Sequence, residues 1–445
     1  MPLSRKFAKV VPDFGPRQPN YHQGWPTARE RLGVFGVFLY AFAMSAYPPA
    51  MEIALLFMLV SLPIACFKRE SLADPLFIAS CFLVLFLSLS IYAGSKTTPH
   101  LISEHFSQAA YVLLIPILSA LVAIHIKGNP NLIKITLLVA LLGVITGIIY
   151  PIVSGEIEFS TLFGGARHEF GFQNPIRLGL FSSAALLGLV LWMPLDMSHK
   201  KGQWIIAILF LLGIVITAYA LLLSQTRASW LGALLTIPIA LFVRLFLLEK
   251  KFGRVALWSV FVATAIAIVF VANSELVESR WQQSQPSLSA LIGQEELPYD
   301  SIGIRLHSWK FGLEHIVERP FFGHGPASVR HYLENSGNRH LRRFGQFHST
   351  PIDLMFRFGL VNTFLVALIF SLFFYSCMSA WRTRRVDPII PLFLAGALVI
   401  FLIDSLTVYG IRTYQVRYYI GMIGGLAYSF HLYCHIAPGQ KRYAH

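Results

Sequence analysis

Five arginine residues lie beside apolar segments and could bind a phosphate group: Arg167, Arg227, Arg305, Arg412 and Arg417. A guanidinium offers a fork of N–H donors that matches phosphate oxygens, so several arginines converging at a membrane surface would suit a lipid-linked diphosphate. Taken singly, each could instead reach lipid headgroups or pair with an acidic side chain. For Arg227 a functional role is favoured, because it lies in a tight turn between two apolar segments.

Histidines gather in the polar region 274–351, where one of them could act as a general base. They are His307, His315, His324, His331, His340 and His348. Zinc is the alternative, but the spacings do not fit zinc motifs and the region has no cysteine, so the sequence predicts no metal and no cofactor. His348 differs from the others because a cap residue, Ser349, and then Pro351 follow it, which is typical of a helix start. We therefore expect His348 just ahead of a membrane helix.

One acidic residue, Asp404, lies at the end of an otherwise apolar stretch, 400–403. A carboxylate in a membrane helix is costly unless it is paired. The sequence therefore predicts that Asp404 is a partner of one of the arginines, with a direct catalytic role as the weaker interpretation.

The composition indicates that membrane helices position these residues. Of 445 residues, 55% are hydrophobic and only 13% are charged, and the mean hydropathy is +0.61. The net charge of +14 does not indicate nucleic-acid binding, because the basic residues lie between apolar segments rather than in a separate basic domain. We predict an all-α integral membrane protein with about twelve spans. The predicted spans are 32–48, 53–67, 75–94, 107–126, 132–153, 176–196, 204–223, 228–248, 255–273, 352–376, 388–409 and 417–436.

The orientation follows from the basic residues of the short loops. If the amino end is inside, every inner loop is positive, and most of the 36 Lys and Arg residues are on the inner side. The five arginines and the histidine cluster then face outward. The predicted organisation is a basic inner tail over 1–31, nine spans over 32–273, a large outer loop domain over 274–351, three spans over 352–436 and an inner tail over 437–445.

The outer loop domain is predicted to be mostly helical. Apolar residues recur near helical spacing over 301–319, and a shorter helix is predicted over 327–335. The residues expected on the apolar face of the first helix are Ile304, Trp309, Leu313, Ile316 and Val317.

These motifs resemble those of bacterial O-antigen ligases, in the ligase and polymerase superfamily of membrane glycosyltransferases. His348-Ser349, nine further residues and then Gly359 resemble the ligase signature, and Asn362 departs from the residues usual after it. The segments 224–231 and 167–174, and Arg305 with Trp309, also look like superfamily segments. The order of the motifs, their common side and the large outer loop extend the resemblance over most of the chain.

The resemblance implies a C-type-like glycosyltransferase fold in the bacterial inner membrane, with cytoplasmic termini and a periplasmic active site. The implied reaction transfers polysaccharide from undecaprenyl diphosphate to lipid A–core oligosaccharide, with inversion and without a metal. The donor, the acceptor and membrane lipids would be the partners of a monomeric protein, and no nucleic acid is expected. The expected catalytic residues are His348 as general base and Arg227 and Arg305 at the diphosphate. The residues expected to bind substrate are Arg167, Asn174, Arg412, Arg417 and Asp404.

Two other functions fit the same sequence. An O-antigen polymerase of the superfamily would use the same donor with a second lipid-linked glycan as acceptor, although the histidine signature favours a ligase. A transporter or lipid flippase also commonly has twelve spans with both ends inside. It should show repeats and helices broken near mid-membrane, whereas here no repeat is visible and the polar residues gather at the outer ends.

Overall fold

The computed structural model is helical throughout the residues that it describes, which are 27–62, 73–163, 166–193, 203–248, 274–283, 285–293, 297–383 and 386–436. No strand occurs among these residues. The predicted span 255–273, most of the tail 1–31, the tail 437–445 and the pair Gly164 and Gly165 lie outside them.

The helices follow the predicted spans closely in the first part of the chain. They are α1 (Ala28–Ala46), α2 (Met51–Val60), α3 (Pro75–Thr97), α4 (Ile102–Ile126), α5 (Pro130–Val153), α6 (Pro175–Trp192), α7 (Gln203–Ser224) and α8 (Arg227–Phe242), which continues as a π-helical segment over Val243–Leu248. The later helices are α10 (Ser274–Gln282), α11 (Gln285–Gly293), α12 (Gly303–Ile316), α13 (Ser328–Glu334), α14 (Thr350–Thr383), α15 (Ile389–Ser405) and α16 (Tyr414–Ile436). Short 3-10 turns include η6 (Phe170–Phe172) and η8 (Gly410–Arg412).

Three of the apolar helices begin with the same local pattern, an Asp or Asn cap followed by proline. Asp74, Asn129 and Asn174 precede the first residues of α3, α5 and α6, and each side chain accepts a hydrogen bond from a backbone N–H of the first turn. The proline needs no hydrogen-bond partner there and has the backbone φ of a helix. These caps set where each helix starts, and therefore which residues lie at its end.

Seven helices are long and apolar enough to cross a membrane, within the part of the chain that the structure describes. They are Pro75–Thr97, Pro99–Ile126, Pro130–Val153, Pro175–Trp192, Trp204–Ser224, Arg227–Phe246 and Thr350–Thr383; Pro48–Val60 and Ile389–Ser405 are apolar but shorter. Large apolar side chains such as Leu85, Leu234 and Ile239 point outward from these helices, as expected where lipid surrounds a bundle. The chain is thus a helical membrane protein, and the count of twelve spans remains a proposal.

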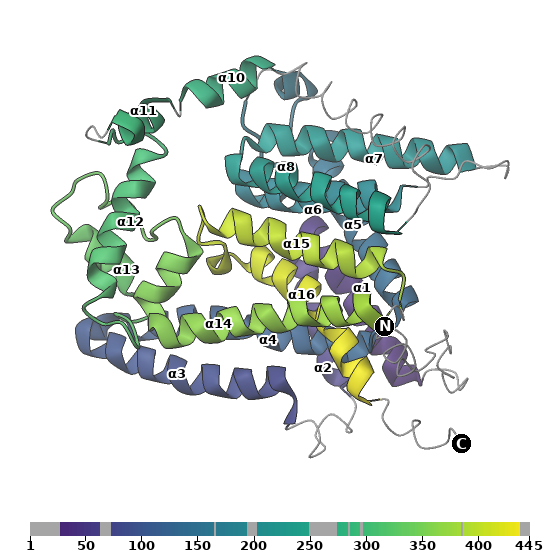
Figure 1. Ribbon diagram of the computed structural model, residues 1–445, viewed down its shortest axis with the longest axis horizontal. Helices are drawn as coiled ribbons and strands as arrows, with labels where there is room; N and C mark the ends of the chain where they lie inside the picture. Colours follow the sequence, from purple (N-terminus) through teal and green to yellow (C-terminus); the bar gives the residue numbers. More distant parts are fainter. Residues whose placement is uncertain are drawn as a thin grey trace, which may run out of the picture.

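The helices pack side by side around one apolar core (Figure 1). The closest pair is α4 and α16, because Gly421 and Gly425 on α16 leave no room for a side chain. A Cβ atom on Gly425 would lie 2.6 Å from the backbone oxygen of Ser119 on α4. Small residues four positions apart allow such close contact between membrane helices.

The two ends of the bundle differ in chemistry. At one end, Lys127 after α4 contacts Glu30 at the start of α1 at 3.2 Å, and the Tyr428 hydroxyl near the end of α16 contacts Asp74 at 2.9 Å. At the other end, α12 and α13 lie across the bundle near the start of α14 (Figure 1). The starts of α1 and α3 are therefore at the end opposite to α12 and α13.

The segment between α11 and α14 has a small apolar core of its own. It is formed by Ile304, Ile316, Val329, Leu333, Leu341, Phe347, Ile352 and Phe356. The last two belong to the first turns of α14, while their neighbours Leu354 and Phe358 belong to the bundle core. The beginning of α14 thus packs on both cores at once.

The two helices expected in this segment are present, but the apolar face of α12 differs from the prediction. Ile304 and Ile316 are buried and Trp309 packs against the small core, as expected. Leu313 and Val317 are 52% and 75% exposed, so their predicted place on the buried face was wrong. Spacing alone could not show this, because α12 packs against only a short piece of α14 and a few loop residues.

Candidate active site

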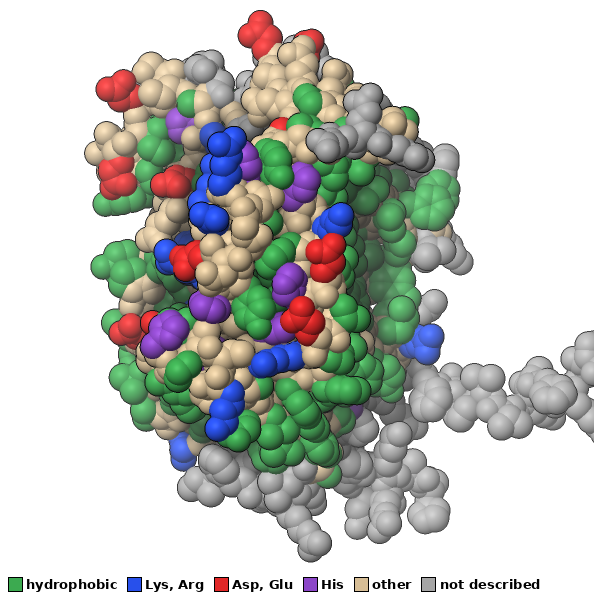
Figure 2. Space-filling model, turned by 90° about the vertical axis from the view of Figure 1, so that its left-hand side faces the viewer, with side chains coloured by type: hydrophobic (Ala, Val, Ile, Leu, Met, Phe, Trp, Pro, Cys, Tyr) green, Lys and Arg blue, Asp and Glu red, His purple; other side chains and the backbone are tan. Residues whose placement is uncertain are grey.

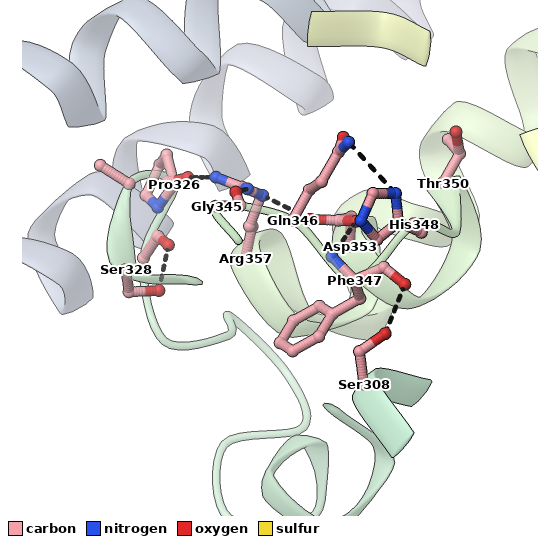
Figure 3. A network of polar contacts seen from close by, with 12 residues as sticks. Ser308, Pro326, Ser328, Gly345, Gln346, Phe347, His348, Thr350, Asp353 and Arg357 are labelled. Carbon is pink, nitrogen blue, oxygen red and sulfur yellow. Dashed lines mark hydrogen bonds and ion pairs between the residues drawn. The ribbon is translucent and has the colours of Figure 1, made fainter. Parts of the chain in front are cut away.

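His348 lies on the sharp turn that leads into α14 (Figure 3). Its φ of +55° is in the left-handed region, which few residues other than glycine adopt, although histidine does so more often than most. On either side of it, Phe347 is fully buried and Ser349 is buried. The turn therefore holds the imidazole between two anchored neighbours, just ahead of a membrane helix as the sequence predicted.

A buried ion pair on α14 holds this turn in place. Arg357 Nε donates to Asp353 Oδ1 at 3.0 Å, one helical turn apart on α14, and both side chains are almost wholly buried. The other carboxylate oxygen of Asp353 accepts the backbone N–H of Phe347 at 2.9 Å. Arg357 also donates to the carbonyls of Pro326 and Gly345, at 2.6 and 2.9 Å. The pair thus ties together the segments on both sides of His348.

Gly359 breaks α14 ten residues after Ser349. Its φ of 75° and ψ of 176° are in a region that only glycine occupies readily. A Cβ atom there would lie 2.1 Å from the backbone oxygen of Phe321. The break lets the N–H of Leu360 donate to Pro320 at 2.7 Å, so the loop after α12 packs directly against α14.

The surroundings of the His348 ring are half-buried and electropositive. The side-chain nitrogen of Gln346 is 3.4 Å from Nδ1, and the Phe344 ring packs edge-on at 4.9 Å. The buried Nε2 atom has no hydrogen-bond partner within the described part of the chain. Burial, and then the positive charge of Arg305, lower the pKa of His348 to about 4. The ring is therefore neutral at physiological pH.

The guanidinium of Arg305 is affected by the charges of two other predicted arginines, Arg167 and Arg227. Burial lowers the pKa of its guanidinium, the positive charges of Arg227 and Arg167 lower it further, and Asp404 partly opposes them. Arg227 is the first residue of α8, and Arg167 donates from Nε to the Ser224 carbonyl at the end of α7 at 3.0 Å. Three separate segments thus bring positive charge to the surroundings of Arg305, whose own charge acts on His348.

Asp404 is buried near the end of α15 and accepts a hydrogen bond from Ser229 Oγ at 2.9 Å. Ser229 is two residues after Arg227, so this bond joins the start of α8 to α15. The carboxylate acts on the charge of Arg305, and its pairing with an arginine stays a prediction. Within the described residues it forms no ion pair shorter than 4 Å with Arg305.

Two further predicted residues, Asn174 and Arg417, make contacts that hold a helix start and a loop in place. The Asn174 side chain accepts the N–H of Ile176 at 2.8 Å and so caps α6. Arg417 is buried, donates to the carbonyls of Ile411 and Arg412 at 3.0 and 2.7 Å, and stacks over Tyr111. These contacts favour positioning roles for Asn174 and Arg417.

Arg412 is exposed at the end of η8, on the side of the turn that carries His348. Its Nη1 atom would lie 3.4 Å from a Cβ atom placed on Gly345. Arg412 therefore lies beside the segment that leads to His348.

The other histidines of the segment serve its packing. His324 is buried and contacts the Tyr332 hydroxyl at 2.9 Å and the His315 carbonyl at 2.8 Å. His307 and His340 stack on the two sides of Tyr299. The rings of these three histidines thus contact other side chains or backbone groups of the protein. Among the described residues, the Nε2 atom of His348 has no such hydrogen-bond partner.

The end of the molecule that holds the site is polar at its surface. Figure 2 shows Lys, Arg, Asp, Glu and His side chains gathered on this face and hydrophobic side chains along its margins. Such a face can admit a hydrophilic ligand while the flanks contact lipid.

Two residues of the site were not predicted from the sequence, Asp353 and Arg357. Both lie in the apolar stretch 352–361 and are spaced as a helical ion pair, i and i+4. Two opposite charges at this spacing next to a candidate catalytic residue were the signal that could have identified them.

Comparison with protein families gives one match. The family model described as O-Antigen ligase matches residues 212–367. The matched region runs from α7 into α14 and includes Arg227, Arg305, His348 and Gly359, whereas Arg167 and Asp404 lie outside it. No curated protein sequence matches the chain.

Proposed function

Because the chain belongs to the O-antigen ligase superfamily, we propose that it is a glycosyltransferase that uses a lipid-linked polysaccharide as donor. The proposed donor is a glycan on undecaprenyl diphosphate and the proposed acceptor is lipid A–core oligosaccharide. The proposed site is the His348 turn together with Arg227 and Arg305, on the periplasmic side of the bacterial inner membrane.

In the proposed step, an acceptor hydroxyl attacks the sugar carbon that bears the diphosphate. A carbon–oxygen bond to the acceptor forms, the bond from that carbon to the diphosphate oxygen breaks, and the sugar inverts. His348 Nε2 takes the hydroxyl proton as the attack proceeds. General base catalysis of this kind typically contributes about 10²–10⁴ in rate.

The leaving group is undecaprenyl diphosphate, which gains negative charge as the bond breaks. Arg227 and Arg305 stabilise that charge, and Arg167 adds to the local positive potential. Fixed positive groups at the place where charge develops lower the barrier without having to reorganise. Arg305 makes no ion pair among the described residues, so its charge is available for an anion.

The tautomer of His348 follows from this role. Gln346 faces Nδ1, and an amide can present either its oxygen or its nitrogen to the ring. With the Gln346 oxygen toward the ring, Nδ1–H donates to it and Nε2 keeps its lone pair for the hydroxyl proton. Gln346 thus orients the base.

The observation that carries the proposal is the convergence of positive charge from three arginines near His348. Arg167 and Arg227 come from different segments than Arg305 and repel its charge, and Arg305 acts in turn on the neutral imidazole of His348, whose Nε2 has no hydrogen-bond partner among the described residues. Without an anion, this arrangement concentrates like charge at a cost to stability. A bound diphosphate relieves the repulsion.

The test is transfer of glycan from undecaprenyl diphosphate to purified lipid A–core by variants of His348. His348→Ala should lower the rate by about 10²-fold or more. His348→Asn is the control for shape, because asparagine tolerates the left-handed backbone, and its loss should be as large. Near wild-type transfer by either variant, folded and inserted, would exclude His348 as the base.

The same assay separates the ligase from a polymerase. A ligase extends only lipid A–core, whereas a polymerase joins one lipid-linked glycan to another. Supplying each acceptor alone and measuring product length therefore decides which acceptor the enzyme uses.

A further inference from the structure

A cavity of about 250 Å³ lies inside the membrane bundle, away from the candidate active site. Helices α1, α5, α6, α7, α15 and α16 line it, with apolar residues such as Leu141, Ala185, Phe210 and Met422. Cavities of about 150 Å³ with such walls stay free of water and bind small hydrocarbons. Water is therefore a poor occupant of this larger cavity.

The cavity faces the surroundings of the bundle through a gap beside α5. Helix α5 packs along α1 and touches α6 and α7 only sparsely, whereas α6 and α7 pack closely together. Leu138, on the lining of the cavity, is 56% exposed. Both α5 and α7 are candidate spans, so the opening is at membrane depth, where lipid chains replace water.

One end of the cavity is polar, and its two polar groups are hydrogen-bond donors. Lys134 is near the start of α5, and Trp192 is the last residue of α6. The indole N–H of Trp192 is buried and has no hydrogen-bond acceptor among the residues that the structure describes. This end of the cavity is the end of the bundle opposite to His348, because α5 starts just after α4 ends at Lys127.

Lys134 already has one acidic neighbour. Its Nζ atom contacts Asp387 Oδ2 at 2.9 Å, and the pair is partly exposed. An ammonium has three N–H donors, so a second anionic partner can still bind it. A phosphate between Lys134 and Trp192 would also supply the acceptor that the indole N–H lacks.

We propose that this cavity binds one acyl chain of an anionic phospholipid from the leaflet opposite to the candidate active site. The chain fills the apolar part of the cavity, and the phosphate and ester oxygens accept hydrogen bonds from Lys134 and Trp192. Basic pockets between membrane helices bind anionic headgroups in this manner. The site is independent of the proposed glycosyl transfer and holds α5 against α6 and α7.

The test is native mass spectrometry of the full-length protein in detergent, with phosphatidylglycerol or phosphatidylcholine added. The wild-type protein should retain one phosphatidylglycerol and prefer it by about fivefold, the factor expected from one basic residue at a membrane surface. Ala185→Phe, which fills the cavity, should abolish retention of this lipid. Trp192→Phe and Lys134→Glu should leave the cavity intact but remove the preference for phosphatidylglycerol.

Matched controls come from the same parts of the fold. Lys127→Glu breaks a similar ion pair at the same end of the bundle, with Glu30, but Lys127 does not line the cavity. Trp204→Phe changes a tryptophan of α7 that is 60% exposed and also outside the lining. Both variants should bind phosphatidylglycerol as the wild type does.

Two results would overturn the proposal. One is a folded Ala185→Phe protein that retains the lipid at the wild-type level. The other is equal retention of the two lipids by the wild type, or equal loss of preference in Lys127→Glu and Lys134→Glu. If Ala185→Phe does not fold, the Trp192→Phe and Lys134→Glu proteins decide the outcome.

Discussion

At the scale of single residues, the basicity of His348 depends on whether the neighbouring positive charge is compensated. Burial and Arg305 hold the pKa of the free protein's His348 at about 4. An imidazole with so low a pKa is neutral but a weak base. A bound diphosphate would cancel the repulsion from Arg305 and raise the pKa of His348, so that the donor itself would make the base stronger.

Removing the charge of Arg305 should raise the pKa of His348 in the free enzyme. Transfer requires neutral His348, so its rate falls as the pH drops through this pKa. In Arg305→Gln the acid limb of kcat/KM should therefore lie at higher pH than in the wild type, although the maximal rate is lower. The measurement is the pH profile of kcat/KM, which reports the free enzyme.

Arg305→Lys is the control for this prediction, because lysine keeps the positive charge. Its acid limb should stay near that of the wild type. An unchanged acid limb in Arg305→Gln would show that Arg305 does not set the pKa of His348, whatever its effect on the rate.

At the scale of elements, the site depends on how α14 begins. The turn at His348, the pair Asp353 and Arg357, and the break at Gly359 follow one another within twelve residues. Each has a different effect on the site. The turn positions the imidazole, and the ion pair binds the loop segments on either side of it. The break at Gly359 leaves room for the backbone of Phe321 to pack against α14. Changes at any of the three should alter catalysis through geometry.

Gly359→Ala should be much more destabilising than the same change at Gly337. Both glycines have positive φ, near 75° and 72°, but a Cβ atom meets nothing at Gly337 and collides with Phe321 at Gly359. Backbone strain costs about 1–3 kcal/mol for a residue in such a region, and the collision adds to this at Gly359 alone. The measurement is the thermal unfolding midpoint of each variant in the same detergent; equal losses would contradict the role given to the close contact.

Asp353→Asn should lower both stability and transfer, because it leaves Arg357 buried without its charged partner. Breaking a buried ion pair from one side costs about 3–5 kcal/mol. The double variant Asp353→Leu, Arg357→Met should recover part of the stability but not the transfer rate, since the N–H of Phe347 still lacks its acceptor. Thermal unfolding and transfer assays on the three proteins check this.

A double variant with wild-type transfer would show that the pair serves the fold alone. Arg330→Ala is a matched control for stability, because its ion pair with Glu334 is highly exposed. Exposed pairs contribute little, so this variant should resemble the wild type.

Features that depend on the local sequence pattern could be predicted from the sequence. Features that depend on packing between distant segments could not. Apolar length indicated where the helices lie, and the cap and proline after His348 placed it ahead of α14. The exposure of Leu313 and Val317 depends on which segments pack against α12, and the spacing of apolar residues carries no information about those segments. Asn174 caps α6 by accepting a hydrogen bond within the first turn of that helix. The residue type alone could not distinguish this capping role from a role in binding substrate.

At the scale of the whole molecule, the polar face with His348 and the end with Lys127 and Asp74 are on opposite sides of the bundle. The proposed reaction needs the His348 end in the periplasm. The excess of basic residues in the short loops of the other end favours this orientation.

Cysteine labelling should place the two ends on different sides of the membrane. In a background with the four native cysteines replaced, Asn335→Cys, at the exposed end of α13, should react with a membrane-impermeant maleimide in intact cells. Asn131→Cys at the start of α5 should react only after the inner membrane is opened. The reverse pattern would put the candidate site in the cytoplasm and contradict the proposed reaction.

The small core of α12 and α13 is completed by Ile352 and Phe356, which belong to α14. A fragment that stops before α14 would lack two of its eight buried residues, so it should not be obtained as a soluble folded unit. For the same reason, chimaeras that exchange the outer segment between related chains need their downstream junction beyond Gly359. Acceptor preference, if it lies in that segment, would then be inherited together with the histidine turn.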